Sequence, residues 1–302
     1  MAEILLSLTI IGVVAAITLP SLTGNINERT WNTQRKALYA RMSQAIALMP
    51  ALNGYGTLTE DEDGSITEDT ATETFITEGL AKVLKINNIC DSEHLEDCGI
   101  PDKITAINAS VIDSIPDTLV GLQSLFAGSF YSQTDTKAAA FETANGESII
   151  AYYNPACSGD NEETNLYMQT KMCANFIYDL NGNKGPNTVG KDIGFISVLY
   201  PTDSIVVAPM PISRQQESNV SQVAAGNACR NLGGEEARLP NRFELASIFY
   251  NNKLVGATVS EQWSSTLYMK NGATQAWTMR FHSGNQGLRD KTGAGYYRCI
   301  KR

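Results

Sequence analysis

The sequence predicts an α+β fold in which a long N-terminal helix packs on an antiparallel sheet and a small second α+β domain follows. Apolar residues recur at helical spacing near the N-terminus, β-branched runs with glycine turns occupy the middle, and a proline-rich linker leads into the last third. We place the domains at residues 1–54, 55–204 and 205–302. A chain of 302 residues with 43% hydrophobic and 18% charged residues is long enough for about two folded domains.

The first element is an uncharged stretch of nineteen residues, Ile4 to Leu22. As a helix it spans about 30 Å, enough to cross a membrane. A secretory signal peptide is the alternative, but no basic segment precedes the stretch and no cleavage site follows it. An amphipathic segment continues directly, with its apolar face formed by Trp31, Ala37, Leu38, Met42, Ala45, Ile46 and Met49. We therefore expect one helix over residues 4–52, weakened at Pro20 and Gly12.

Glu3 stands at the edge of this apolar stretch, where a carboxylate is costly in lipid unless it is paired. The pattern of Glu3, Ile10-Ile11-Gly12 and Pro20 resembles the N-terminal helix of type IV pilins and of the pseudopilins of type II secretion. The resemblance implies a pilin globular sheet behind the helix. It also implies that Glu3, Gly12 and Pro20 serve assembly, with Glu3 paired to the N-terminal ammonium of a neighbouring subunit.

The start of the chain departs from that family. Its mature members have four residues before the glutamate, beginning with a methylated residue that is usually phenylalanine, whereas only Met1 and Ala2 precede Glu3. We expect a truncated start, with the leader peptide and the methylated residue outside this sequence.

The middle segment is predicted to combine one short helix with an antiparallel sheet. The apolar spacing from Phe75 to Asn87 indicates the helix. A turn at residues 144–146 indicates a hairpin. The strands are expected at residues 138–141, 148–153, 175–180 and 194–200.

Six cysteines fall in neighbouring pairs and none forms a CxxC motif, so disulfides and an oxidising compartment are expected; unpaired buried thiols are the alternative. The expected bonds are Cys90–Cys98, Cys157–Cys173 and Cys229–Cys299.

Charge is distributed unevenly along the chain. Residues 56–204 carry seven basic and twenty-four acidic residues, whereas residues 205–302 carry twelve basic and six acidic ones. The formal net charge of −9 argues against specific nucleic-acid binding. The two histidines, His94 and His282, are too few for a histidine-rich zinc site and too far apart in sequence to suggest a hydrolytic triad, so we do not expect an enzyme.

An oxygen-rich loop follows the third expected strand. Its Gly185–Lys191 part resembles a phosphate-binding loop only superficially, because Asp192 replaces the Ser/Thr that would bind magnesium. Calcium is the candidate cation, because it takes six to eight oxygen ligands, and major pseudopilins carry a calcium loop in a similar place. A loop without metal is the favoured interpretation, because Lys184 and Lys191 add positive charge and loops rich in Asn, Asp and Gly are common without metal. The candidate ligands are Asp179, Asn181, Asn183, Asn187 and Asp192.

The last segment is expected to contain helices at residues 219–232 and 242–251, followed by short aromatic strands. It resembles the small C-type-lectin-like domain of bacterial surface proteins such as the collagen-like adhesin of Legionella. The resemblance is carried by Cys229, Arg238-Leu239-Pro240, Glu244-Leu245, Trp263-Ser264-Ser265, Trp277, Phe281, Gly284, Arg298 and Cys299. The calcium–sugar signatures of animal lectins are absent, so calcium-dependent sugar binding is not implied. The related formylglycine-generating enzymes use free cysteines or copper at their active site. Cys229 and Cys299 are expected to be paired with each other, which argues against that activity.

The basic surface of this segment suggests attraction to glycans or other polyanions; docking on the acidic middle of a neighbouring subunit is the alternative. The candidate ligand-binding residues are Arg280, Arg289, Lys291 and Arg298.

These observations lead to one expected function. The pilin resemblance implies that the chain is a structural subunit of a type IV pilus-like helical filament on the bacterial surface. We expect it to be anchored in the inner membrane and handled by pilus assembly machinery before it polymerises with itself. Its C-terminal domain is displayed for adhesion or surface recognition. Two alternatives remain open: a pseudopilin of a type II secretion system, and a glycan-binding adhesin carried as a minor pilin.

Overall fold

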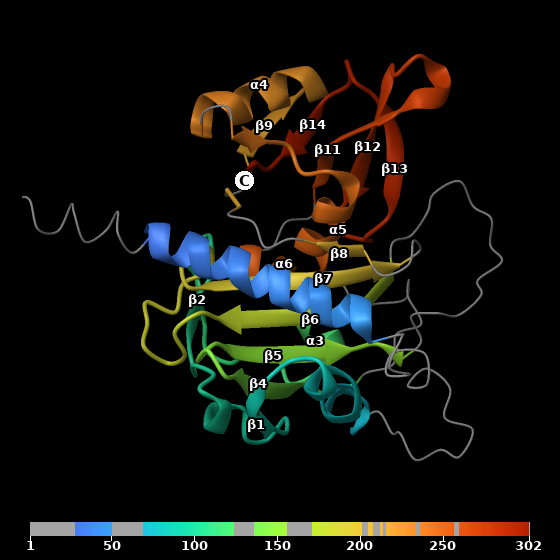
Figure 1. The fold of residues 1–302 in the computed structure, drawn as a ribbon. Coiled ribbons are helices and arrows are strands. Elements are labelled where there is room, and N and C mark those ends of the chain that lie inside the picture. Colours follow the sequence, from blue (N-terminus) through green and yellow to red (C-terminus); the bar gives the residue numbers. More distant parts are fainter. Residues whose placement is uncertain are drawn as a thin grey trace, which may run out of the picture.

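A six-stranded antiparallel sheet lies at the centre of the computed structural model (Figure 1). The strand order is β1-β4-β5-β6-β7-β8. The strands are β1 (Ile86–Cys90), β4 (Ala139–Thr143), β5 (Ser148–Tyr153), β6 (Lys171–Asp179), β7 (Ile193–Tyr200) and β8 (Ile205–Val207). The structure describes residues 28–49, 69–123, 136–155, 171–200, 205–207, 212–213, 216–233, 236–256 and 260–301.

Both faces of this sheet are covered. Every residue of β5 is buried, and successive side chains of a strand point to opposite faces. Ile149 and Tyr153 accordingly belong to one hydrophobic cluster, whereas Ile150 and Tyr152 belong to another. A strand that is apolar on both faces needs a helical layer on each side, and the chain supplies both.

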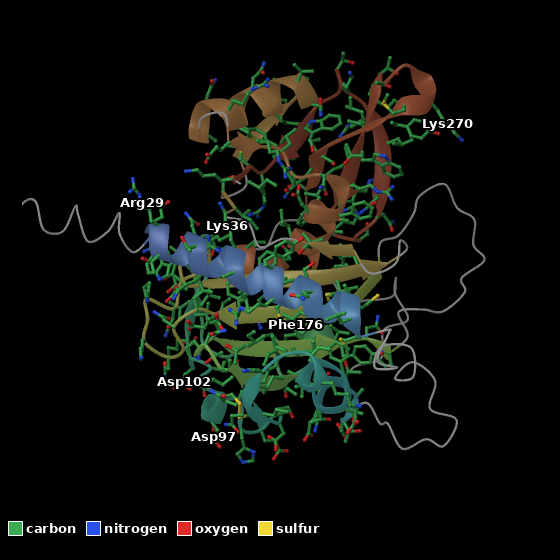
Figure 2. All side chains as sticks on the ribbon, viewed as in Figure 1. Arg29, Lys36, Asp97, Asp102, Phe176 and Lys270 are labelled. Carbon is green, nitrogen blue, oxygen red and sulfur yellow. A yellow bond between two sulfur atoms is a disulfide. The ribbon has the colours of Figure 1, made fainter. Side chains whose placement is uncertain are left out.

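The helix over residues 28–48 covers one face, crossing the strands obliquely in Figure 1. Leu38 and Met42 are fully buried against the sheet, and Phe176 lies beneath this helix in Figure 2. Ala37, expected on the apolar face, is instead exposed. The layer is completed by three short turns, α2 (Ala71–Thr74), the π-helix η2 (Phe75–Gly79) and the 3-10 helix η3 (Leu80–Lys82).

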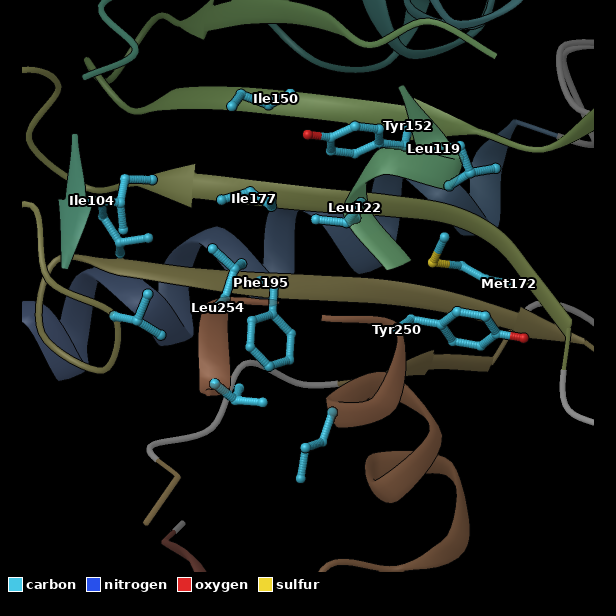
Figure 3. Close-up of a cluster of buried hydrophobic side chains, with 14 of the residues drawn as sticks. Ile104, Leu119, Leu122, Ile150, Tyr152, Met172, Ile177, Phe195, Tyr250 and Leu254 are labelled. Atoms are coloured by element: carbon cyan, nitrogen blue, oxygen red, sulfur yellow. The ribbon is translucent and has the colours of Figure 1, made fainter. Parts of the chain in front are cut away.

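The opposite face is covered by three further helices. Phe195 of β7 packs in one cluster with Tyr250 of α5 and Leu254 of α6, as Figure 3 shows. The helices are α3 (Leu119–Gln123), α5 (Arg242–Tyr250) and α6 (Asn252–Val255). Two of them come from the last segment of the chain, so that segment shares a core with the central sheet.

A second sheet is built by the C-terminal residues, in the order β13-β12-β11-β14-β9. Only the β11–β14 pairing is parallel within it. Its strands are β9 (Gln216–Val220), β11 (Glu261–Tyr268), β12 (Gln275–Arg280), β13 (Gln286–Asp290) and β14 (Gly295–Tyr297). The helix α4 (Gln222–Gly233) packs on it around the buried Trp263 and Cys229.

The remaining elements are short. The 3-10 helix η4 (Leu95–Cys98) follows β1, and η6 (Met269–Asn271) joins β11 to β12. Two small two-stranded sheets pair β2 (Ile104–Thr105) with β3 (Val111–Ile112) and β10 (Ala237–Arg238) with β15 (Ile300–Lys301).

The expected fold class is wrong. The structure is mixed α/β with mostly strands in several sheets, rather than one long helix on a pilin sheet followed by a small lectin-like domain. Among the described residues only the helix at 28–48 is long. The helix expected over 75–87 breaks into short turns and then strand β1, because Ile86, Asn88 and Ile89 pair with β4.

Several local expectations agree with the structure. The strands expected in the middle segment correspond to β4, β5, β6 and β7, with shifted ends, and residues 144–146 join β4 to β5. None of the described helices is both long and apolar enough to cross a membrane. The apolar stretch Ile4 to Leu22 lies outside the described residues. The domain boundaries stay a prediction.

Candidate functional site

The residues predicted to serve assembly, Glu3, Gly12 and Pro20, lie outside the described residues. The helix at 28–48 that follows them in the sequence is described, and it presents two different faces. One is buried on the sheet, whereas the other exposes Arg29, Lys36 and Ala40, the first two of which point away from the sheet in Figure 2. The exposed face is free of the sheet along the whole described helix.

Arg35 fastens this helix to the loop between β6 and β7. Its side chain is 4% exposed, and its Nε donates a hydrogen bond to Tyr178 Oη at 3.1 Å. Its Nη2 donates to the carbonyl of Lys191 at 2.6 Å and to that of Gly190 at 3.3 Å. Its Nη1 donates to Asn32 Oδ1 at 2.7 Å. Burial of a guanidinium is tolerated when its donors are satisfied, and here four acceptors receive them.

Close packing brings Tyr178 to that position. Its cross-strand partner is Gly194, where an added Cβ would lie 2.2 Å from Tyr178 Oη. The glycine therefore leaves room for the phenol to lie over β7 and meet Arg35. Burial raises the pKa of Tyr178 to about 12, so the hydroxyl stays neutral and accepts the Arg35 hydrogen bond.

A second contact joins the helix to the β4–β5 hairpin. Arg41 forms a bidentate ion pair with Glu147, whose exposed fraction is only 5%. Thr143 Oγ1 also donates to the Glu147 carboxylate. Arg35 thus attaches the helix to the β6–β7 loop and Arg41 attaches it to the β4–β5 turn, roles that the sequence analysis did not assign to either residue.

The candidate calcium loop holds itself together mostly through its own hydrogen bonds. Both carboxylate oxygens of Asp192 accept backbone N–H groups, from Asn187 and Thr188, each at 2.9 Å. Asn187 Oδ1 accepts the Gly185 N–H at 3.0 Å. The Asn183 side chain lies in an exposed turn. These three candidate ligands are therefore engaged in loop structure or open to solvent.

Asp179 and Asn181 differ from them. Asp179 is 2% exposed, and its Oδ1 accepts the Asn181 N–H at 3.0 Å. Among the described residues, Asp179 Oδ2 and Asn181 Oδ1 are buried and have no hydrogen-bond partner. Burial, reinforced by the charge of Asp192, raises the pKa of Asp179 to about 7.

The two unpartnered oxygens, Asp179 Oδ2 and Asn181 Oδ1, are the atoms of this loop that could bind a metal ion. A proton or a cation would satisfy Asp179 Oδ2, and an oxygen-only pair suits a hard cation. In the part of the chain that the structure describes, no three Asp, Glu, His or Cys side chains gather at one point. Of the five expected ligands, Asp179 and Asn181 are the two with a buried side-chain oxygen that lacks a hydrogen-bond partner in the described structure, and calcium binding stays a prediction.

The basic residues proposed to bind ligands do not form one surface. Arg280 is exposed at the end of β12, Lys291 is partly exposed, and Arg289 donates to Glu261 at 3.1 Å. Arg298 is 2% exposed and donates to the carbonyls of Val255 and Gly256. Arg298 thus holds the end of α6 inside the protein, and its assignment as a ligand residue is corrected.

Two of the predicted disulfides are confirmed. Cys90 is bonded to Cys98, and Cys229 to Cys299. Cys173 is also disulfide-bonded, whereas Cys157 lies outside the described residues, so that pairing stays a prediction.

Comparison of the chain with known protein families finds no match. A search of curated proteins likewise finds none. The functional argument therefore rests on the residues and contacts above.

Proposed function

We propose that this chain is a structural subunit of an extracellular helical filament on a bacterial surface, and that its C-terminal residues are displayed for recognition. The observation that carries the proposal is the order of elements at the N-terminus. An uncharged stretch of nineteen residues, preceded by Glu3, leads after a few residues into a helix that uses only one face for the globular core. That order supplies an apolar assembly element and a rigid support for it.

Repeated contacts between copies of the chain would build the filament. A contact between different surfaces of identical copies generates an open helix unless its rotation closes. Staggered apolar segments would replace lipid with one another, and Glu3 would pair with an ammonium group, since an unpaired buried charge is costly. The two confirmed disulfides support exposure to an oxidising exterior.

The helix contacts support a mechanical role. Arg35 and Arg41 attach the helix to two separate parts of the sheet layer through charge-assisted hydrogen bonds. Such hydrogen bonds are stronger than those between neutral groups, and each joins residues that are more than 100 positions apart in the sequence. Load applied along the helix is therefore transferred to the globular part at two points.

We further propose that the loop after β6 binds one calcium ion through Asp179 and Asn181. The support is the pair of buried oxygens without partners in the described structure. Calcium affinity depends on the number of charged ligands, and a single carboxylate favours the weak class, with a dissociation constant of about 0.1–1 mM.

The filament proposal is tested by imaging surface material sheared from cells that express the chain. Long fibres labelled by an antibody to this chain support it. A chain that stays in the envelope without fibres, while its deletion blocks protein secretion, points instead to the pseudopilin alternative.

A further inference from the structure

The C-terminal sheet carries one arginine whose surroundings differ from those of its neighbours. Arg242 is the first residue of α5, and its guanidinium carbon lies 4.6 Å from the ring centre of Phe243 and 5.1 Å from that of Trp277. Two aromatic faces therefore hold this guanidinium in place by cation–π attraction.

The charge of Arg242 has no acidic counterpart. Among the described residues, Arg238 pairs with Glu244 and Arg289 with Glu261, but no carboxylate pairs with Arg242 and no hydrogen bond involves its side chain. The side chain is partly buried, and burial alone lowers its pKa. Its N–H donors are not among the buried atoms that lack partners, so they remain accessible from solvent.

The backbone around Arg242 is already satisfied, which separates this site from a generic helix N-terminus. Asn241 caps the helix by accepting the N–H groups of Phe243 and Glu244, and the Arg242 N–H donates to Thr266 Oγ1 at 3.0 Å. The groups at this position that can still bind a ligand are the N–H donors of the planar guanidinium.

An aromatic ring extends the site. Tyr268 packs edge-on to Trp277, with ring centres 6.4 Å apart, and it pairs with Gln275 on the strand that carries Trp277. Residues 275 and 277 of a strand share one face, so Tyr268, Trp277 and Arg242 lie on the same side of the sheet. Tyr268 is partly exposed, whereas Trp277 is 8% exposed.

From this arrangement we infer that Arg242, Trp277 and Tyr268 form a binding site for a uronic acid unit of an acidic polysaccharide. A carboxylate matches the planar, bidentate donor geometry of a guanidinium that stacking has already oriented. A pyranose acid carries that carboxylate beside an apolar C–H face, which suits the aromatic ring of Tyr268. An aspartate or glutamate side chain supplies the carboxylate without such a face.

This inference deepens the recognition role in the proposed function by naming its ligand and its residues. It also differs from general attraction by a basic surface. Arg230 lies near the end of α4 and is exposed. A ligand attracted by net charge alone would respond alike to an Arg→Lys substitution at Arg230 and at Arg242, because both substitutions keep the charge.

The test measures binding of trigalacturonate to the detergent-solubilised full chain by calorimetry. The variants are Arg242→Lys, which keeps the charge and removes the planar fork, Tyr268→Ala, and the matched control Arg230→Lys. We expect at least tenfold weaker binding for Arg242→Lys, about threefold weaker for Tyr268→Ala, and less than twofold change for Arg230→Lys. The methyl ester of the same sugar, which has no carboxylate charge, should bind at least tenfold more weakly to the unaltered chain.

Equal effects of Arg242→Lys and Arg230→Lys would overturn the site, as would binding of the ester at full strength or no binding of trigalacturonate. Binding of tetraglutamate as tight as that of trigalacturonate would overturn the sugar assignment in favour of an acidic peptide. Since the chain is unassembled in this experiment, failure of the site leaves the filament proposal standing, and absence of fibres leaves the site standing.

Discussion

Arg35 donates a hydrogen bond to Tyr178 Oη at 3.1 Å, joining two residues that are 143 positions apart. The bond connects the helix at 28–48 to β6 at the point where β6 enters the 180–192 loop. The same guanidinium reaches the loop carbonyls of Gly190 and Lys191. One side chain thus ties the proposed assembly helix to the loop that carries the candidate cation ligands.

Arg35→Ala should lower the free energy of unfolding by about 2–4 kcal/mol, because it leaves buried acceptors without their charged donor. Urea denaturation of the detergent-solubilised chain measures this. The matched control is Arg29→Ala, which removes an exposed arginine from the same helix and should change stability by less than about 0.5 kcal/mol. Equal effects of both substitutions would show that Arg35 does not fasten the helix.

The raised pKa of Asp179 predicts a particular dependence of stability on pH. The folded chain holds the Asp179 proton up to about pH 7, whereas the unfolded chain releases it near 3.8. The contribution of protonated Asp179 to the free energy of unfolding is therefore fully present below pH 3.8 and is lost as pH rises to about 7. Asp179→Asn should match the unaltered chain near pH 4 and exceed it in melting temperature above pH 7. Parallel melting curves across this range would contradict the assignment.

Calcium should counteract that loss. Binding requires ionised Asp179, so 5 mM calcium should raise the melting temperature at pH 7.5 and have little effect at pH 4.5. The Asp179→Asn variant should not respond at either pH, whereas Asp102→Asn, which removes an exposed acid elsewhere, should respond like the unaltered chain. A calcium response that survives in Asp179→Asn would place the ion elsewhere, and no response in the unaltered chain would remove the calcium proposal.

The two confirmed disulfides should differ in their effects. Cys229–Cys299 closes a separation of 70 residues and Cys90–Cys98 one of 8. Loop-closure entropy then predicts a loss of about 4 kcal/mol for the paired serine substitution at the first bond and about 2.5 kcal/mol at the second. Denaturant titration compares them, and a larger loss at Cys90–Cys98 would contradict the chain-entropy explanation.

The sequence predicted the strands better than it predicted their surroundings. The run Ser148–Tyr153 is mostly apolar on both faces, which favours a buried strand. Alternating or β-branched residues predicted the neighbouring strands of the same sheet. Periodicity does not say what covers a face, however. The helix expected at residues 242–251 corresponds to α5, and it packs on β7 of the central sheet. Asn251, at its end, exchanges hydrogen bonds of 2.8 and 3.0 Å with Asn175 of β6.

Individual charged residues were harder to place from the sequence. Arg35 and Arg298 are both buried, and only the folded backbone reveals the carbonyls that receive their donors. Arg242 was overlooked because charge counting weighs all arginines alike. The adjacent Phe243 was the one local signal, since neighbouring aromatic and basic residues often stack.

The central claim, filament assembly, is tested most directly by electron microscopy of sheared surface material from cells expressing the unaltered chain, Glu3→Ala or Glu28→Ala. Glu28 is an exposed acid in the described helix and serves as the control. We predict abundant fibres from the unaltered chain and from Glu28→Ala. Glu3→Ala should remain in the membrane fraction, because apolar length sets insertion, while its fibre yield falls at least tenfold. Normal fibre yield from Glu3→Ala, or no fibres containing this chain from any of the three strains, would contradict the account.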